Sequence, residues 1–216
     1  MRLIFSKRLW IFVAGTVLLA FGITLNTKTM LGVSPIISIP YSISQISGLD
    51  LGVLVFAFYV LYILLQWVLL GRNFQKFQLL QIVNSFMVSA MVSLFNRLLP
   101  DVQGAAAQYS LLAAAIVLTG IGAALTVGMR LIPNPADAFA DVIGMKLHKN
   151  FGFGKNVFDL TCVGVTTTIG LASAGHLIGI GSGTLCAMIF TGRVIAFCGC
   201  PVKKLYDGVS EQPDYC

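Results

Sequence analysis

Apolar residues run continuously along several stretches of the chain, and short polar segments separate these stretches. A continuous apolar run of about 18–22 residues spans the hydrocarbon core of a bilayer as a helix. A strand of a membrane β-barrel would instead alternate apolar and polar residues over about ten positions. The pattern therefore predicts an all-α, polytopic membrane protein. Six spans are expected, at about residues 9–25, 51–70, 78–99, 109–129, 156–174 and 177–197.

Two further segments, 31–44 (LGVSPIISIPYSIS) and 131–144 (LIPNPADAFADVIG), are apolar but interrupted by proline and polar residues. Ser34-Pro35 and Asn134-Pro135 each place a preferred N-cap residue directly before a proline, and proline is favoured as the first residue of a helix. We expect two short, proline-started half-helices, over about 34–48 and 134–149, that are broken or re-entrant.

Displacing the sequence by one hundred residues aligns Gly22 with Gly122 and Pro35 with Pro135 without a gap. This predicts one membrane domain made of two repeats, 1–100 and 101–216, and the second repeat ends in a cytoplasmic tail from residue 199. Weak internal repeats of this kind are typical of transporter folds.

The number of spans decides how the repeats are related. If the half-helices do not cross, each repeat has three spans and the second repeat is inverted; if they cross, eight spans make the repeats parallel. Six spans leave only Lys28 and Arg97 on the outer side among the basic residues of loops and termini, which satisfies the positive-inside rule better. Both models place the N- and C-termini in the cytoplasm.

The composition agrees with a membrane protein, since 57% of the residues are hydrophobic and 10% are charged, against about 25% charged in soluble domains. The net charge of +6 comes from basic residues scattered at segment ends, which indicates topology signals rather than nucleic-acid binding. No zinc motif, phosphate loop or Ser/His/Asp set occurs at suitable spacing. We therefore expect no enzyme activity, no metal and no cofactor.

The starts of the two half-helices form the predicted binding site. The first turn of a helix carries backbone N–H groups without intrahelical partners and the positive end of the helix dipole. Two such starts that enter from opposite faces would approach each other near the midplane, an arrangement in which discontinuous helices bind solutes. The predicted substrate-binding residues are Ser34, Pro35, Ser38, Asn134, Pro135, Asp137 and Asp141.

The acidic residues leave two interpretations open. Asp137 and Asp141 share one helical face because they are four residues apart. Either they hold a substrate amine, a cation or a coupling proton, or Asp137 caps the helix and Asp141 pairs with a base such as Arg130 or Lys155. Asp159 either pairs with Lys155 or faces the cavity. Lys28, Arg130 and Asp159 are the candidates for coupling or charge balance.

At the motifs Gly32-Val33-Ser34-Pro35 and Asn134-Pro135-Ala136-Asp137 the chain resembles the YitT/YczE-type bacterial multipass membrane proteins. In that family a Gly-Pro-x-Asp type motif can occur in both halves. Pro135-Ala136-Asp137 fits this motif, whereas the first copy has lost the acid, so the site is expected to be asymmetric. The resemblance implies a protein of the bacterial inner membrane and is compatible with transport.

These observations predict a secondary transporter or permease for a small polar or anionic solute. Its expected partners are the lipid bilayer, the solute and further copies of the chain, with no nucleic acid. The alternative is a non-transporting membrane scaffold or the regulatory subunit of a larger complex.

Overall fold

The computed structural model describes residues 2–209, and within them every regular element is helical. The first half contains α1 (Arg2–Lys28), α2 (Pro35–Ser47), α3 (Leu51–Leu70), the 3-10 turns η1 (Gly71–Asn73) and η2 (Lys76–Leu80), and α4 (Gln81–Leu98). The second half contains α5 (Ala105–Gly128), α6 (Pro135–Lys146), α7 (Phe151–Ala174) and α8 (Ser182–Val209).

Six of these helices are long and apolar enough to cross a membrane, namely α1, α3, α4, α5, α7 and α8. The helices α2 and α6 have 13 and 12 residues, so each is about 20 Å long at 1.5 Å per residue. That is well short of the ~30 Å hydrocarbon core. The predicted all-α architecture with six candidate spans is confirmed.

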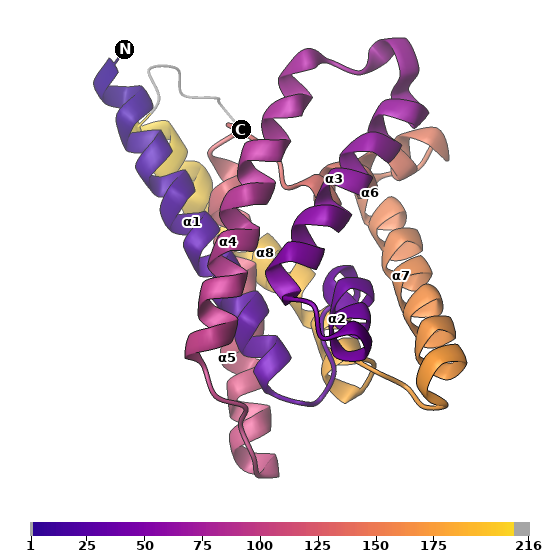
Figure 1. Cartoon of the computed structure of the whole chain (residues 1–216). Coiled ribbons are helices and arrows are strands. Elements are labelled where there is room, and N and C mark those ends of the chain that lie inside the picture. The colour runs from indigo at the N-terminus through magenta and orange to yellow at the C-terminus, as the bar shows by residue number, and fades with distance from the viewer. Residues whose placement is uncertain (1, 210–216) are drawn as a thin grey trace.

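The helices form two groups that pack mainly within themselves (Figure 1). The helices α1, α4, α5 and α8 make one group, in which α5 packs along both α1 and α8. The helices α2, α3, α6 and α7 make the other group, in which α2 and α6 each pack against both α3 and α7. The extended contact of α3 with α4 joins the groups, while α7 and α8 make no extended contact within the described chain.

Glycines permit the close crossing of α1 and α5 in the first group. A Cβ atom at Gly22 would lie 2.4 Å from the Thr119 hydroxyl oxygen, and one at Gly122 would lie 2.4 Å from the Leu19 backbone nitrogen. Neither position can carry a side chain without moving the helices apart, because real contacts of a Cβ atom are longer than 3 Å. These two glycines therefore let α1 and α5 pack closely.

Several predicted boundaries were wrong. The first helix begins at Arg2 and ends at Lys28, rather than covering 9–25, and α5 begins at Ala105 rather than residue 109. The helix α7 begins at Phe151 rather than at residue 156. The Asn150 side chain caps α7 by accepting a hydrogen bond of 2.9 Å from the Phe153 N–H.

The start of the last span was also misplaced, because residues 177–181 are not helical and α8 begins at Ser182. This segment pairs with the loop before α2: Val33 N–H donates to the Gly179 carbonyl at 2.9 Å, and Gly183 N–H donates to the Leu31 carbonyl at 2.8 Å. The predicted tail from residue 199 is helical through Val209, and its remainder, 210–216, lies outside the described residues.

Candidate functional site

A cavity of about 950 Å³ lies between the two helix groups, which is in the upper part of the size range of small-molecule pockets. Its walls come from α1, α5 and α8 on one side and from the starts of α2 and α6 with α3 and α7 on the other. The first residues of both half-helices, Ser34-Pro35 and Asn134, line this one cavity. The structure therefore brings together two segments that are one hundred residues apart in sequence.

The start of α6 is tightly held. Asn134 is its N-cap, with Pro135 as the first helical residue, and the Asn134 side-chain oxygen accepts a hydrogen bond of 3.0 Å from the Ala136 N–H. The Pro135 carbonyl accepts a hydrogen bond of 3.1 Å from the side-chain amide of Gln66 on α3. Gln66 is completely buried and exchanges two further amide hydrogen bonds with Gln81. The predicted Asn134-Pro135 helix start is confirmed.

The start of α2 is held by hydroxyl groups instead. Ser34 is the N-cap and Pro35 the first helical residue, as predicted, although the Ser34 side chain makes no capping hydrogen bond. The Ser38 hydroxyl donates to the Pro35 carbonyl at 2.7 Å and lies 2.7 Å from the hydroxyl of Thr166 on α7. Thr166 on α7 thus anchors the first turn of α2, and Gln66 on α3 anchors the first turn of α6. In each case a long span of one half holds the short helix of the other half.

Charged side chains gather on the α6–α7 wall of the cavity. The Lys155 ammonium lies 3.2 Å from an Asp159 carboxylate oxygen and 3.9 Å from an Asp137 carboxylate oxygen. The Asp159 side chain is only 8% exposed, so its charge depends on this partner. Asp141 also lines the cavity, one turn after Asp137. Lys155 therefore bridges two of the three carboxylates. The sequence left open whether Asp159 pairs with Lys155 or faces the cavity, and in the structure it does both.

Aromatic packing fixes α6 between its neighbours. The rings of Tyr62 and Phe139 stack at a centroid distance of 5.7 Å, and Phe158 meets both rings edge-on, at 5.1 and 5.3 Å. These residues come from α3, α6 and α7 respectively. Such pairs stabilise packing beyond the burial of their surface, so the cluster holds α6, and with it Asp137 and Asp141, at a set position beside the cavity.

Four predicted residues lie elsewhere. Ser38 and Pro135 are buried in the anchors behind the cavity rather than in its lining. Lys28 pairs with Asp101 at 3.2 Å. Arg130 lies at a second pocket, with its guanidinium 5.1 Å from the Tyr206 ring centre. The cavity therefore contains neither of the two predicted charge-balancing bases.

The cavity is also lined by polar residues that the sequence did not predict, and three of them, Asn73, Gln75 and Gln78, come from the segment after α3. Tyr59 is fully buried beside Asn134. For Gln66, which holds the start of α6, the sequence did carry a signal, since an amide inside the most apolar span is unusual. Among the described residues no group of His, Cys, Asp or Glu side chains is arranged to hold a metal ion. The missed polar lining residues are Asn73, Gln75, Gln78, Thr119, Asn156 and Thr191.

The fold and the cavity define an α-helical multipass membrane protein in which two short helices begin at a shared internal site. The chain belongs to a family of unknown function, DUF6198, whose model matches residues 6–199. It is also similar to the uncharacterized membrane protein YczE of Bacillus subtilis (strain 168), with 28% identity over 195 residues that cover 85% of this chain and 81% of that protein. No solved structure matches the chain. The resemblance to YczE-type proteins is confirmed.

Proposed function

We propose that this protein is a secondary transporter or permease for a small polar solute, which binds in the cavity between the starts of α2 and α6. The observation that carries the proposal is that both helix starts, one from each half, line a single cavity together with carboxylates. Inside a bilayer, helix starts are tolerated only where protein or a polar cavity satisfies their backbone groups. Discontinuous helices at the midplane are a common basis of transporter binding sites.

The charge of the cavity favours one kind of solute. The sequence leaves a polar or an anionic solute open, but the lining holds three carboxylates, of Asp137, Asp141 and Asp159, against the single ammonium of Lys155. An anion would meet net repulsion in a site partly screened from water. A neutral or cation-bearing polar solute is the better fit.

The arrangement of the helices supports inverted repeats with re-entrant half-helices. Helices begin at Pro35 and Pro135, and again at Leu51 and Phe151, so the two halves have helix starts at matching positions. Because each half contains three spans, an odd number, the second half runs through the membrane in the opposite direction to the first half. The short helices then enter from opposite sides of the membrane. We further propose that the basic ends of the bundle face the cytoplasm of a bacterial inner membrane, with both termini inside. The proposal involves no catalytic step and no cofactor.

The broken symmetry between the halves suggests how access to the cavity alternates. The helices α3 and α4 are closed against each other, with Asp50 hydrogen-bonded to Ser93 and paired with Arg97 at 3.3 Å. Their counterparts α7 and α8 stand apart, and the cavity is lined from both. In the proposed cycle the second pair closes while the first opens, so that the two helix groups move relative to each other.

Uptake into proteoliposomes tests the function. Purified protein would be reconstituted and supplied with labelled methylammonium, glycine, glycerol or acetate, which represent the four charge classes of small solutes. We expect faster uptake than into empty liposomes for at least one of the first three probes. Asp137→Asn, which keeps the shape of the side chain but removes its charge, is expected to abolish this uptake.

Asp101→Asn is the matched control, because Asp101 pairs with Lys28 outside the cavity and its side chain is 61% exposed. Uptake should survive this substitution. Equal rates in empty and protein-containing liposomes for all four probes would refute transport of this class of solutes. Undiminished uptake by Asp137→Asn would remove the carboxylate from the mechanism.

The second candidate, a scaffold or regulatory subunit, is favoured by the surface of α8. Only 11% of the residues in its most apolar stretch are buried by the chain itself, and Arg193 is exposed on this helix. A charged side chain facing lipid costs several kcal/mol (about 2.5–3.5 by insertion scales), so a second copy or another protein would cover it favourably. Purification of a fixed partner, together with no uptake of any probe, would favour this candidate.

A further inference from the structure

The two walls of the central cavity differ in their chemistry. The lining residues from α1, α5 and α8 include no charged or amide side chain, and their polar groups are the hydroxyls of Thr119 and Thr191. Every charged side chain among the described lining residues comes from α6 or α7, on the facing side. The cavity is therefore amphipathic, with an apolar wall opposite an acidic wall.

The apolar wall is built by three helices. Leu19 and Ile23 of α1, Ala123 of α5 and Met188 of α8 all contribute to it. Water gains little from such a surface, and an apolar group of a ligand that replaces this water binds favourably. The cavity volume of about 950 Å³ leaves room for such a group beside a charged one.

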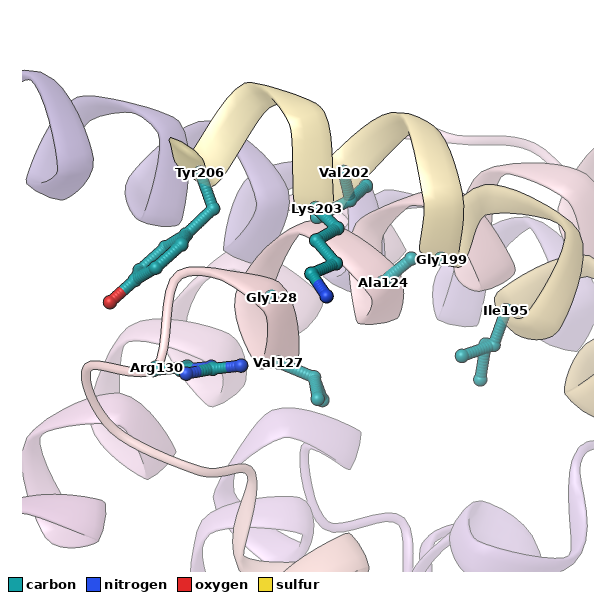
Figure 2. Close-up of a pocket in the computed structure, with 9 residues that line it drawn as sticks. All are labelled: Ala124, Val127, Gly128, Arg130, Ile195, Gly199, Val202, Lys203 and Tyr206. Atoms are coloured by element: carbon teal, nitrogen blue, oxygen red, sulfur yellow. The ribbon is translucent and has the colours of Figure 1, made fainter. Parts of the chain in front are cut away.

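The cations of a neighbouring pocket do not neutralise the acidic wall. Val127 on α5 and Ile195 on α8 line both the cavity and a second pocket of about 180 Å³, in which Figure 2 shows them together with Arg130 and Lys203. Neither of these two basic residues lines the central cavity. The charge balance of the cavity therefore depends on its own lining residues.

The acidic wall holds more carboxylates than cations. Asp137 and Asp141 of α6 and Asp159 of α7 line the cavity, and Lys155 is the one basic residue among the described lining residues. The Lys155 ammonium lies 3.2 Å from Asp159 and 3.9 Å from Asp137. A single ammonium thus serves two carboxylates, and a second positive charge would bring the wall closer to neutrality.

The carboxylates become less accessible to water from Asp141 to Asp159. Asp141 is exposed, whereas the side chain of Asp137 is 24% exposed and that of Asp159 is 8% exposed. Within the described chain, Lys155 is the only side chain that forms an ion pair with Asp159. Opposite charges attract more strongly where water is excluded, and a buried carboxylate that must share its partner is costly. A cation beside Asp137 and Asp159 is therefore favoured over one beside Asp141.

We propose that the solute of this cavity is a small amphiphilic cation, in which an ammonium group carries an apolar chain or ring. The ammonium group binds beside Asp137 and Asp159, and the apolar part packs against α1, α5 and α8. An uncharged solute would leave the charge of the acidic wall unbalanced, and a solute without an apolar part would leave the facing wall against water. The inference rests on the proposed function, since it names the class of the proposed solute.

Ligand binding tests the inference without reference to transport. The full chain would be purified in detergent and unfolded by heat over a concentration series of each ligand, because a ligand that binds the folded state raises the unfolding temperature. Butylammonium has both features, methylammonium lacks the chain, butanol lacks the charge, and butyrate reverses it. A fully buried methylene group strengthens binding about fourfold, so butylammonium should bind at least about tenfold more tightly than methylammonium. Butanol and butyrate should bind more weakly than butylammonium.

Two variants assign the two parts of the ligand to the two walls. Asp137→Asn should weaken the binding of butylammonium and leave that of butanol unchanged. Met188→Ser should reduce the difference between butylammonium and methylammonium. The matched controls are Asp101→Asn and Ile189→Ser, since Ile189 follows Met188 on α8 but is 50% exposed and lies outside the cavity lining. Both controls should bind all four ligands as the wild-type protein does.

Several results would overturn the inference. Equal binding of methylammonium and butylammonium would exclude recognition of the apolar part, and butyrate that binds as tightly as butylammonium would exclude recognition of the charge. Equal losses in the cavity variants and their controls would mean that the ligand binds elsewhere. If a cavity variant fails to fold, the comparison of the four ligands on the wild-type protein still decides.

The same measurements separate this inference from the proposed transport. Binding of butylammonium without uptake of any probe into proteoliposomes would refute transport and leave the ligand class standing. Uptake of glycine or glycerol by a protein that does not bind butylammonium would support transport and overturn the ligand class.

Discussion

The side-chain amide of Gln66 donates a hydrogen bond of 3.1 Å to the backbone carbonyl of Pro135, across 69 residues of sequence. The bond joins the C-terminal part of a long span, α3, to the first residue of the short helix that carries Asp137. Since both groups are buried, neither can turn to water if the other is removed. The position of the cavity's acidic wall therefore depends on an amide in the opposite half of the chain.

Replacing Gln66 by Leu should destabilise the protein by about 1–3 kcal/mol, because the Pro135 carbonyl and the Gln81 amide lose buried partners. Equilibrium unfolding in mixed detergent would measure the change. In the double variant Gln66→Leu/Gln81→Leu only the carbonyl remains unpaired, so its loss should be smaller than the sum of the two single losses. Additive losses would show that the two amides do not act together.

Replacing Thr166 by Val removes the hydroxyl that contacts Ser38 while keeping the shape of the side chain. We expect a loss of about 1 kcal/mol and a weaker attachment of α2, visible as faster hydrogen exchange in its first turn. Thr161→Val is the control, since that exposed hydroxyl bonds only to the Val157 carbonyl of its own helix. The same exchange rate in both variants would contradict an anchoring role for Thr166.

Gly52 and Gly152 occupy corresponding positions but have different surroundings. A Cβ atom at Gly52 would lie 2.3 Å from the Ser89 carbonyl oxygen and would also clash with Ser93, whereas one at Gly152 would lie 3.6 Å from its nearest neighbour. Gly52→Ala should therefore cost about 1–3 kcal/mol by forcing α3 from α4, and Gly152→Ala should be tolerated. Unfolding temperatures of the two variants provide the test, and equal values would contradict the closed packing of α3 on α4.

Asp50 makes stability depend on pH. Burial alone would raise the pKa of this carboxyl, but hydrogen bonds from Ser93, Arg97 and the N–H groups of Val53 and Gly52 outweigh burial and hold its pKa below the ordinary value. A lowered pKa in the folded state means that the carboxylate stabilises fully above its unfolded pKa of about 3.9. This contribution is lost as the pH falls through the folded-state pKa.

Asp50→Ala should accordingly lower the stability by about 1 kcal/mol at pH 7, as the loss of an N-cap does, and the difference from wild type should shrink below about pH 4. Unfolding at pH 7, 5 and 3 measures this. Asp101→Ala should change little at pH 7, because its side chain is 61% exposed. A difference between Asp50→Ala and wild type that stays constant with pH would exclude the carboxylate as its source.

The sequence predicted local features well, because they depend on neighbouring residues. Long apolar runs predicted the six candidate spans, and Ser34-Pro35 and Asn134-Pro135 predicted both short helix starts to the residue. Local rules failed where tertiary contact overrides them. Residues 151–155 lie outside the predicted span 156–174 but belong to α7, and α7 packs so closely on α6 there that a Cβ atom at Gly154 would come within 2.2 Å of the Ala140 carbonyl oxygen.

The composition and periodicity of the chain by themselves determined that it is a helical membrane protein, since apolar surface of this length must leave water. Only the tertiary structure decided which polar groups meet. Sequence spacing placed Asp137 and Asp141 on one face, but it carried no information that Gln66 would hold Pro135, or that Lys155 would stand between Asp137 and Asp159 while Lys28 paired elsewhere. Those pairings follow from how the two helix groups pack, because a buried charge or amide takes whichever partner the packing brings within reach.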